Sequence, residues 1–169
     1  ALPVFTDQYS IDSLTKKFPY IFQRDTVYAH KPIIGGGIPL LDLHLVQNQI
    51  VGEEFQFFPL PHGHGDSLCF LHSKLGYIID CRVVPELILK TFRDAELEIL
   101  VIDCLRYTPH ETYLHLDLAL KYIHSIKPKL AVLTHMGHDL DYLDLNHQLR
   151  QRSIKNVFPA IDGQSFLYS

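Results

Sequence analysis

Histidine and aspartate side chains stand just after three apolar segments that we predict to be β-strands. They are His62, Asp80 and His135, which follow the apolar segments 55–60, 77–79 and 130–133. Open α/β sheets place their chemistry in the crevice beyond the carboxyl ends of strands. Neutral imidazoles and carboxylates bind zinc and manganese, and they also move protons. The pattern therefore predicts a site where several strands end.

Size and composition favour one folded, soluble domain. The chain has 169 residues, of which 47% are hydrophobic and 20% charged. No apolar run approaches the ~20 residues of a membrane span, so we expect no membrane partner. The net charge is -4 and basic residues are scattered, so a nucleic-acid partner is unsupported. The first residues lack a secretory pattern, and we expect a cytoplasmic protein.

The three cysteines, Cys69, Cys81 and Cys104, show no CxxC spacing and lie in or beside apolar segments. We interpret them as buried, reduced thiols, with a thiolate nucleophile or a zinc site as the alternatives. The chain also has 11 histidines, so position in the fold must identify the functional ones.

The first half of the chain is predicted to be mostly β-structure. Asp7 or Ser10 is expected to cap a helix that ends near Lys17, with Tyr9, Leu14 and Phe18 as its apolar stripe. Residues 18–22 are predicted to be a packed loop, and the glycines at 35–37 a flexible turn rather than a phosphate cradle. The predicted strands are 2–6, 41–46, 55–60, 68–72 and 77–80, with a hairpin across 73–76.

The second half alternates between strands and helices. Predicted helices cover residues 85–92, 114–125 and 143–150, and predicted strands cover 99–102, 130–133, 157–158 and 166–168. A β-meander followed by βαβ units indicates an α+β fold, with a sheet covered by helices and a second sheet behind it.

Four segments together resemble the metallo-β-lactamase superfamily. They are PLPHG (59–63), GYIID (76–80), VIDCLRYTPH (101–110) and LTHMGHDLDY (133–142). More narrowly, they resemble its small phosphodiesterases, which are related to phosphoribosyl cyclic phosphate phosphodiesterase and to RNase Z. The resemblance covers nearly the whole chain and implies an αββα sandwich.

The resemblance also implies a site with two divalent ions, zinc or manganese. In it His62 would bind one ion, Asp80 would bridge both, and His135 would bind the second. Such a bridge holds two ions about 3.5–4 Å apart around a hydroxide that attacks phosphorus.

The sequence departs from the family because the signature HxHxDH loop is absent. The segment His62–Asp66 shares only HxHxD spacing. The chain therefore resembles the C-terminal two thirds of a single domain, 1–169, without its first strands. We expect the remaining ligands to hold metal poorly. We also expect the edge at 2–6 to pair with another chain in a dimer, or with a missing N-terminal segment.

Two residues are assigned catalytic roles beside Asp80. His110 is interpreted as a general acid or phosphate contact, the alternative being a capping or surface histidine. Tyr113 stands where relatives often carry the second histidine of an H-x-x-H pair, and its phenol is expected to bond a phosphate oxygen.

Further residues are expected to contact substrate or to orient ligands. Asp103 would orient a metal-binding histidine, unless it caps a turn. Arg106 would clamp a phosphate, unless it is a solvated surface arginine. His138 and Asp139 would contact substrate or support the ligands, unless they cap the next helix. We group His64 with these residues.

The leading hypothesis is a metal-dependent phosphodiesterase acting on a small cyclic or nucleotide-like phosphate. One alternative is an RNase Z-like nuclease. Another is a catalytically inactive fragment or binding module of the same fold. No G-x-S-x-G or G-x-G-x-x-G motif supports a serine hydrolase or a nucleotide fold.

Overall fold

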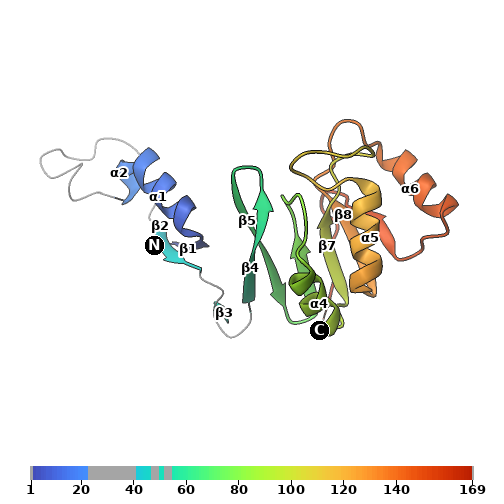
Figure 1. Cartoon of the computed structure of the whole chain (residues 1–169), viewed down its shortest axis with the longest axis horizontal. Coiled ribbons are helices and arrows are strands. Elements are labelled where there is room, and N and C mark those ends of the chain that lie inside the picture. Colours follow the sequence, from blue (N-terminus) through green and yellow to red (C-terminus); the bar gives the residue numbers. More distant parts are fainter. Residues whose placement is uncertain (1, 23–40, 47–49, 52–54, 169) are drawn as a thin grey trace, which may run out of the picture. The chain divides into compact units, whose positions relative to one another are not determined.

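The computed structural model describes residues 2–22, 41–46, 50–51 and 55–168 (Figure 1). The chain divides into two compact units, residues 1–49 and residues 50–169. Each is described separately, and one domain over residues 1–169 stays a prediction. The glycine turn expected at 35–37 lies outside the described residues.

In the first unit a strand, two helices and a second strand follow one another. They are β1 (Leu2–Thr6), α1 (Gln8–Lys17), α2 (Pro19–Phe22) and β2 (Leu41–Leu45), and β1 pairs with β2 in parallel. Asp7 caps α1, because its Oδ1 accepts a hydrogen bond from the Ser10 amide at 2.9 Å. The predicted strand, helix and cap are confirmed.

Two expectations for the first unit are wrong. Residues 19–22 are helical rather than a loop, because Pro19 takes the first helical position, where its missing amide hydrogen costs nothing. Tyr9 and Phe18 do not belong to a buried stripe, since 79% of Tyr9 and 39% of Phe18 are exposed. Pairing of the edge at 2–6 with another chain stays a prediction.

The second unit contains a seven-stranded sheet. Its strands lie side by side in chain order: β3 (Ile50–Val51), β4 (Phe55–His62), β5 (Gly65–His72), β6 (Leu75–Ile78), β7 (Ile99–Asp103), β8 (Leu130–Thr134) and β9 (Val157–Pro159). Pairing is antiparallel from β3 to β6 and parallel from β6 to β9. The hairpin between β5 and β6 turns more tightly than predicted, at Ser73 and Lys74. The strand predicted at 166–168 does not form.

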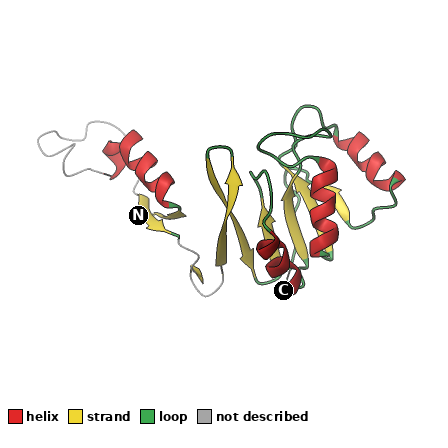
Figure 2. Ribbon diagram, viewed as in Figure 1, coloured by secondary structure: helices red, strands yellow, loops and turns green. Residues whose placement is uncertain are grey.

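Three helices pack against one face of this sheet. They are α4 (Glu86–Asp94), α5 (Leu116–Ile126) and α6 (Tyr142–Gln151), and in Figure 2 α4 and α5 lie in front of the strands. Alternate residues of β7, Leu100 and Ile102, are fully buried among them, together with Phe92 of α4. The side chains on one face of the sheet, which are every second residue of a strand, thus pack against the apolar stripe of each helix. The three predicted helices are confirmed, with ends displaced by one or two residues.

The cysteines lie in this packed region. Cys69, Cys81 and Cys104 are buried and unpaired, as predicted. Burial raises the pKa of Cys69 and of Cys104 to about 12, so both stay protonated and unreactive near neutral pH.

Strand direction brings the predicted site residues to one edge. Two antiparallel steps separate β4 from β6, so β4 runs in the same direction as β6, β7 and β8. The carboxyl ends of these four strands therefore meet at the same edge of the sheet.

The packing of α4 depends on a glycine in β6. A Cβ atom at Gly76 would lie 2.6 Å from Leu97 Cδ1 and 2.9 Å from Phe92 Cδ2. We expect Gly76→Ala to lower the free energy of unfolding by about 1–3 kcal/mol, because the core has no room for a methyl group. Urea unfolding measures this. Gly65→Ala is the control, since a Cβ atom there would meet no atom of another part of the chain within 4 Å. Equal stability of the two variants would contradict the packing.

Candidate active site

A fully buried carboxylate lies at the centre of the strand edge. Asp103, the last residue of β7, has 0% exposure. Its Oδ2 accepts a hydrogen bond from the Leu114 amide at 3.3 Å, and its Oδ1 lies 3.1 Å from Nδ1 of His135. Burial raises the pKa of Asp103, while the Leu114 amide and His135 act in the opposite direction. Asp103 thus contacts the ring of His135, and its role in orienting a metal ligand stays a prediction.

Asp80 joins the same group. Its Oδ1 lies 3.3 Å from Nδ1 of His135, and both side chains are 41% exposed. Two carboxylates therefore face one nitrogen. A proton on Nδ1 of the neutral ring would be shared with these carboxylates and would leave the lone pair of Nε2 available.

Both residues have unusual backbone conformations. The φ angle is 51° at Asp80 and 59° at His135, which is the left-handed region. Aspartate and histidine are among the few residue types enriched there, although the conformation still costs free energy. Strained backbone is often found at functional sites, where surrounding structure holds it in place.

The ring of Tyr113 connects three histidines. Its centroid lies 4.9 Å from that of His62, 5.1 Å from that of His110 and 5.1 Å from that of His135. These residues come from the end of β4, the loop after β7 and the end of β8. The three predicted ligands, His62, Asp80 and His135, thus lie in one cluster and not on opposite sides of the molecule.

The loop 104–115, which carries His110 and Tyr113, is held by hydrogen bonds within the loop and to the segment around the end of β8. The Leu105 amide donates a hydrogen bond to the Leu114 carbonyl at 3.0 Å, and the Gly137 amide donates one to the Leu105 carbonyl at 2.8 Å. The guanidinium of Arg106 donates to the carbonyls of Thr108 and Pro109 inside the loop. Arg106 therefore stabilises the loop, and its role as a phosphate clamp stays a prediction.

Thr112 is a contact that the sequence did not reveal. Its amide donates to Nδ1 of His110 at 3.1 Å, and its carbonyl lies 3.3 Å from Nδ1 of His62. Its only sequence signal is its place between His110 and Tyr113. Backbone atoms of this residue therefore orient two histidines of the cluster.

Three predicted residues lie at the margin. His64, in the turn between β4 and β5, is exposed, as are His138 and Asp139, in the turn after β8. No described contact joins them to the cluster, and their roles stay predictions. Helix-capping is wrong as the alternative for His138 and Asp139, because Asp141 caps α6 through a 2.9 Å bond from the Asp144 amide.

The donor types fit a divalent metal, but their number is small. His62 and His135 each have Nδ1 beside an oxygen, which leaves Nε2 for a metal, and Asp80 adds a carboxylate. Within the described ranges, no three His, Cys, Asp or Glu side chains are close enough to hold an ion. These residues therefore fall short of a complete metal site, and their role as metal ligands stays a prediction.

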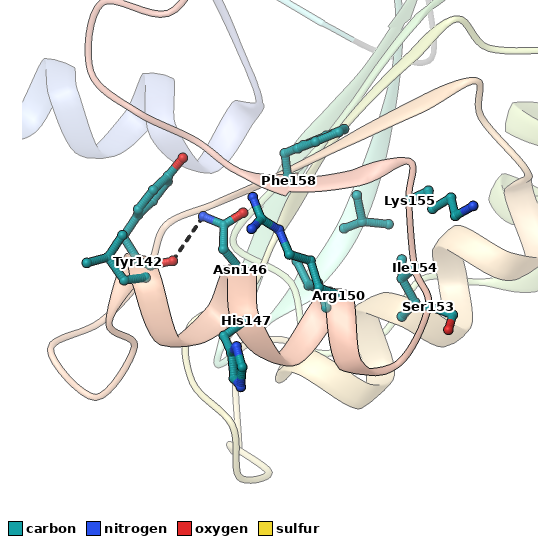
Figure 3. A pocket seen from close by; sticks show the side chains of 11 residues that line it. Tyr142, Asn146, His147, Arg150, Ser153, Ile154, Lys155 and Phe158 are labelled. Atoms are coloured by element: carbon teal, nitrogen blue, oxygen red, sulfur yellow. Dashed lines mark hydrogen bonds between the residues drawn. The ribbon is translucent and has the colours of Figure 1, made fainter.

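A separate hollow of about 730 Å³ lies between α6 and the segment that leads into β9 (Figure 3). In it the Asn146 side chain donates to the Tyr142 carbonyl at 3.1 Å. None of the predicted site residues lines it. The site is therefore assigned to the strand edge and not to this hollow.

Comparison with known proteins identifies the family. Residues 1–136 match the family model described as the Beta-lactamase superfamily domain. The chain belongs to the metallo-β-lactamase superfamily. The predicted family is thus confirmed. None of the curated proteins compared with the chain is a significant sequence match.

Solved structures of this superfamily share the fold. A diphosphatase of the PhnP family has a TM-score of 0.78 and 24% identity, over 99% of this chain and 58% of its own. Zinc-bound PqqB from Methylobacterium extorquens has a TM-score of 0.68 and 12% identity, over 96% of this chain and 63% of its own. Human tRNase Z, short form, has a TM-score of 0.55 and 14% identity, over 96% of this chain and 66% of its own.

These likenesses confirm the predicted metallo-β-lactamase-like fold. The chain spans between 58% and 66% of the length of these three structures. Among the helices that the structure describes, none is long and apolar enough to cross a membrane.

The strained backbone at His135 makes a prediction about stability. We expect His135→Gly to be more stable than His135→Ala by about 0.5–1 kcal/mol, because glycine adopts a left-handed φ without a steric penalty. Chemical denaturation of both variants measures the difference. At His124, inside α5, the order should reverse, since glycine weakens a helix. An alanine variant at His135 that is as stable as the glycine variant would contradict the assigned backbone.

Proposed function

We propose that this chain is a metal-dependent phosphodiesterase acting on a small cyclic or nucleotide-like phosphate. The observation that carries the proposal is the cluster of His62, Asp80 and His135 around Tyr113, at the edge where four strands end. Family membership supports hydrolysis. The diphosphatase and tRNase Z among the structural neighbours support a phosphate ester or anhydride as substrate.

His62, Asp80 and His135 would hold the metal. When bound, a divalent ion would supply an activated water and offset negative charge on the phosphoryl oxygens. Asp103 supports this arrangement because its contact with Nδ1 fixes the orientation of the His135 ring. The opposite nitrogen, Nε2, is then held in place to bind the metal. The zinc in one structural neighbour supports zinc as the ion, with manganese as the alternative.

His110 and Tyr113 would handle the proton and the substrate oxygens. Their rings are 5.1 Å apart, and Tyr113 also contacts the predicted ligands His62 and His135. A phenol and an imidazole can each donate a hydrogen bond to a phosphoryl oxygen, or a proton to the leaving alkoxide. We assign these roles to them in the cleavage of a phosphodiester.

Charge supports a small substrate over RNA. The chain has a net charge of -4 and no long run of basic residues. Proteins that grip a nucleic-acid backbone place several basic side chains along it. A small phosphodiester needs only the metal and the donors of one cluster.

One observation favours a second candidate, a binding module of the same fold without activity. The described residues contain no complete group of metal ligands, and tight zinc sites use three or four protein donors. Metal analysis separates the two candidates. A working enzyme holds close to two ions per chain, whereas an inactive module holds few or none and does not hydrolyse a phosphodiester.

Hydrolysis of bis(p-nitrophenyl) phosphate with added zinc or manganese tests the proposed function. We expect His135→Ala and Asp80→Ala to lower the rate by more than about 100-fold, because loss of mere supporting residues already costs 10–100-fold. His124→Ala, which removes an exposed histidine of α5, is the control and should keep the parent rate. Parent-like rates in the two site variants would refute the proposal.

Asp103→Asn tests how the ligand is oriented. The asparagine oxygen would keep the bond from the Leu114 amide, so its NH₂ group would face Nδ1 of His135. That reverses the position of the ring proton, and we expect zinc affinity to fall by about 10–100-fold. Calorimetric titration with zinc measures it. Asp94→Asn, on the exposed end of α4, should bind zinc like the parent chain, and an equal affinity of Asp103→Asn would contradict the orientation.

A further inference from the structure

The cluster contains histidines with opposite hydrogen-bond requirements. Nδ1 of His110 faces the Thr112 amide at 3.1 Å, and Nδ1 of His62 faces the Thr112 carbonyl at 3.3 Å. A backbone amide can only donate and a backbone carbonyl can only accept. In the neutral rings, Nδ1 of His110 must therefore be an acceptor and Nδ1 of His62 must be a donor.

Each assignment determines the second nitrogen of the ring. His62 carries its proton on Nδ1, so its Nε2 has a free lone pair. His110 carries its proton on Nε2, so that nitrogen is a hydrogen-bond donor. His135 resembles His62, because its Nδ1 faces the carboxylates of Asp80 and Asp103.

We propose that Thr112 is a positioning residue. Its carbonyl keeps the ring proton of His62 on Nδ1, and its amide keeps the ring proton of His110 on Nε2. Resting on the proposed function, this makes His62 a suitable metal ligand, as Asp80 and Asp103 do for His135, and it makes His110 a donor toward the phosphoryl group. His110 is then not a third metal ligand, although it lies in the same ring cluster. Both critical contacts use the backbone of Thr112, so the arrangement depends on the fold of the loop rather than on the threonine hydroxyl.

Contacts of Thr112 show how the loop is fixed. Its methyl carbon Cγ2 would lie 3.6 Å from a Cβ atom at Gly63, which follows His62 and has a φ of 58°. Its hydroxyl lies 3.3 Å from Nδ1 of His110, where it adds a second polar contact. Thr112, in the loop after β7, thus contacts His62 at the end of β4 through its carbonyl.

Long-range ¹H–¹⁵N correlation NMR on the metal-free chain, with ¹⁵N-labelled histidine, reads the tautomers directly. The measurement is made above the ordinary histidine pKa of about 6.5. We expect the proton on Nδ1 in His62 and His135 and on Nε2 in His110. Single His→Gln variants assign the signals. A proton on Nε2 of His62, or on Nδ1 of His110, would overturn the proposal.

Two substitutions of Thr112 then test the backbone origin. Thr112→Val keeps the amide and carbonyl, and all three tautomers should be unchanged. Thr112→Pro removes the amide donor, and His110 should gain a detectable Nδ1–H population while His135 stays as it was. A changed tautomer in Thr112→Val would overturn the backbone assignment. Should Thr112→Pro not fold, the parent and valine spectra decide.

The same spectra separate this inference from the proposed function. An inactive chain with the expected tautomers would refute phosphodiester hydrolysis and support the positioning by Thr112. An active chain with reversed tautomers would do the opposite.

Discussion

The buried carboxylate of Asp103 and the ring of His135 form the interaction on which the site depends. A carboxylate removed from water is costly unless hydrogen bonds replace its hydration. Asp103 meets this requirement through the Leu114 amide on one oxygen and His135 on the other. The same two contacts tie the end of β7 to the loop that carries Tyr113 and to the residue after β8. The hydrogen bonds that the Asp103 carboxylate requires therefore hold three parts of the site together.

Strand direction explains why the sequence could predict that His62, Asp80 and His135 lie at one edge of the sheet. His62, Asp80 and His135 are far apart in the chain, but each follows an apolar segment. The predicted βαβ units indicate parallel strands from β6 to β8, and two antiparallel steps of the β-meander give β4 the same direction, so all four end at a common edge. The positions of β4, β6, β7 and β8 followed from those local patterns. Their register follows from the tertiary pairing, which no single segment encodes.

Other features could not be predicted because they depend on backbone geometry. The hydrogen bonds of Thr112 use atoms that every residue except proline possesses, so its type gives no signal. The guanidinium of Arg106 is engaged by carbonyls of its own loop, and only the path of that loop reveals this. The helix at 19–22 was missed because aromatic residues beside a proline are compatible with either a loop or a first helical turn.

The central claim is that His62, Asp80 and His135 share one metal-accessible edge. Paramagnetic broadening of backbone amide signals by Mn²⁺ tests it most directly, because it maps even weakly bound ions. As Mn²⁺ is added in small amounts, signals from the segments around residues 62, 80 and 135 should broaden first and together, with loop 110–114. Early broadening confined to some other part of the chain, with these segments unaffected, would contradict the account.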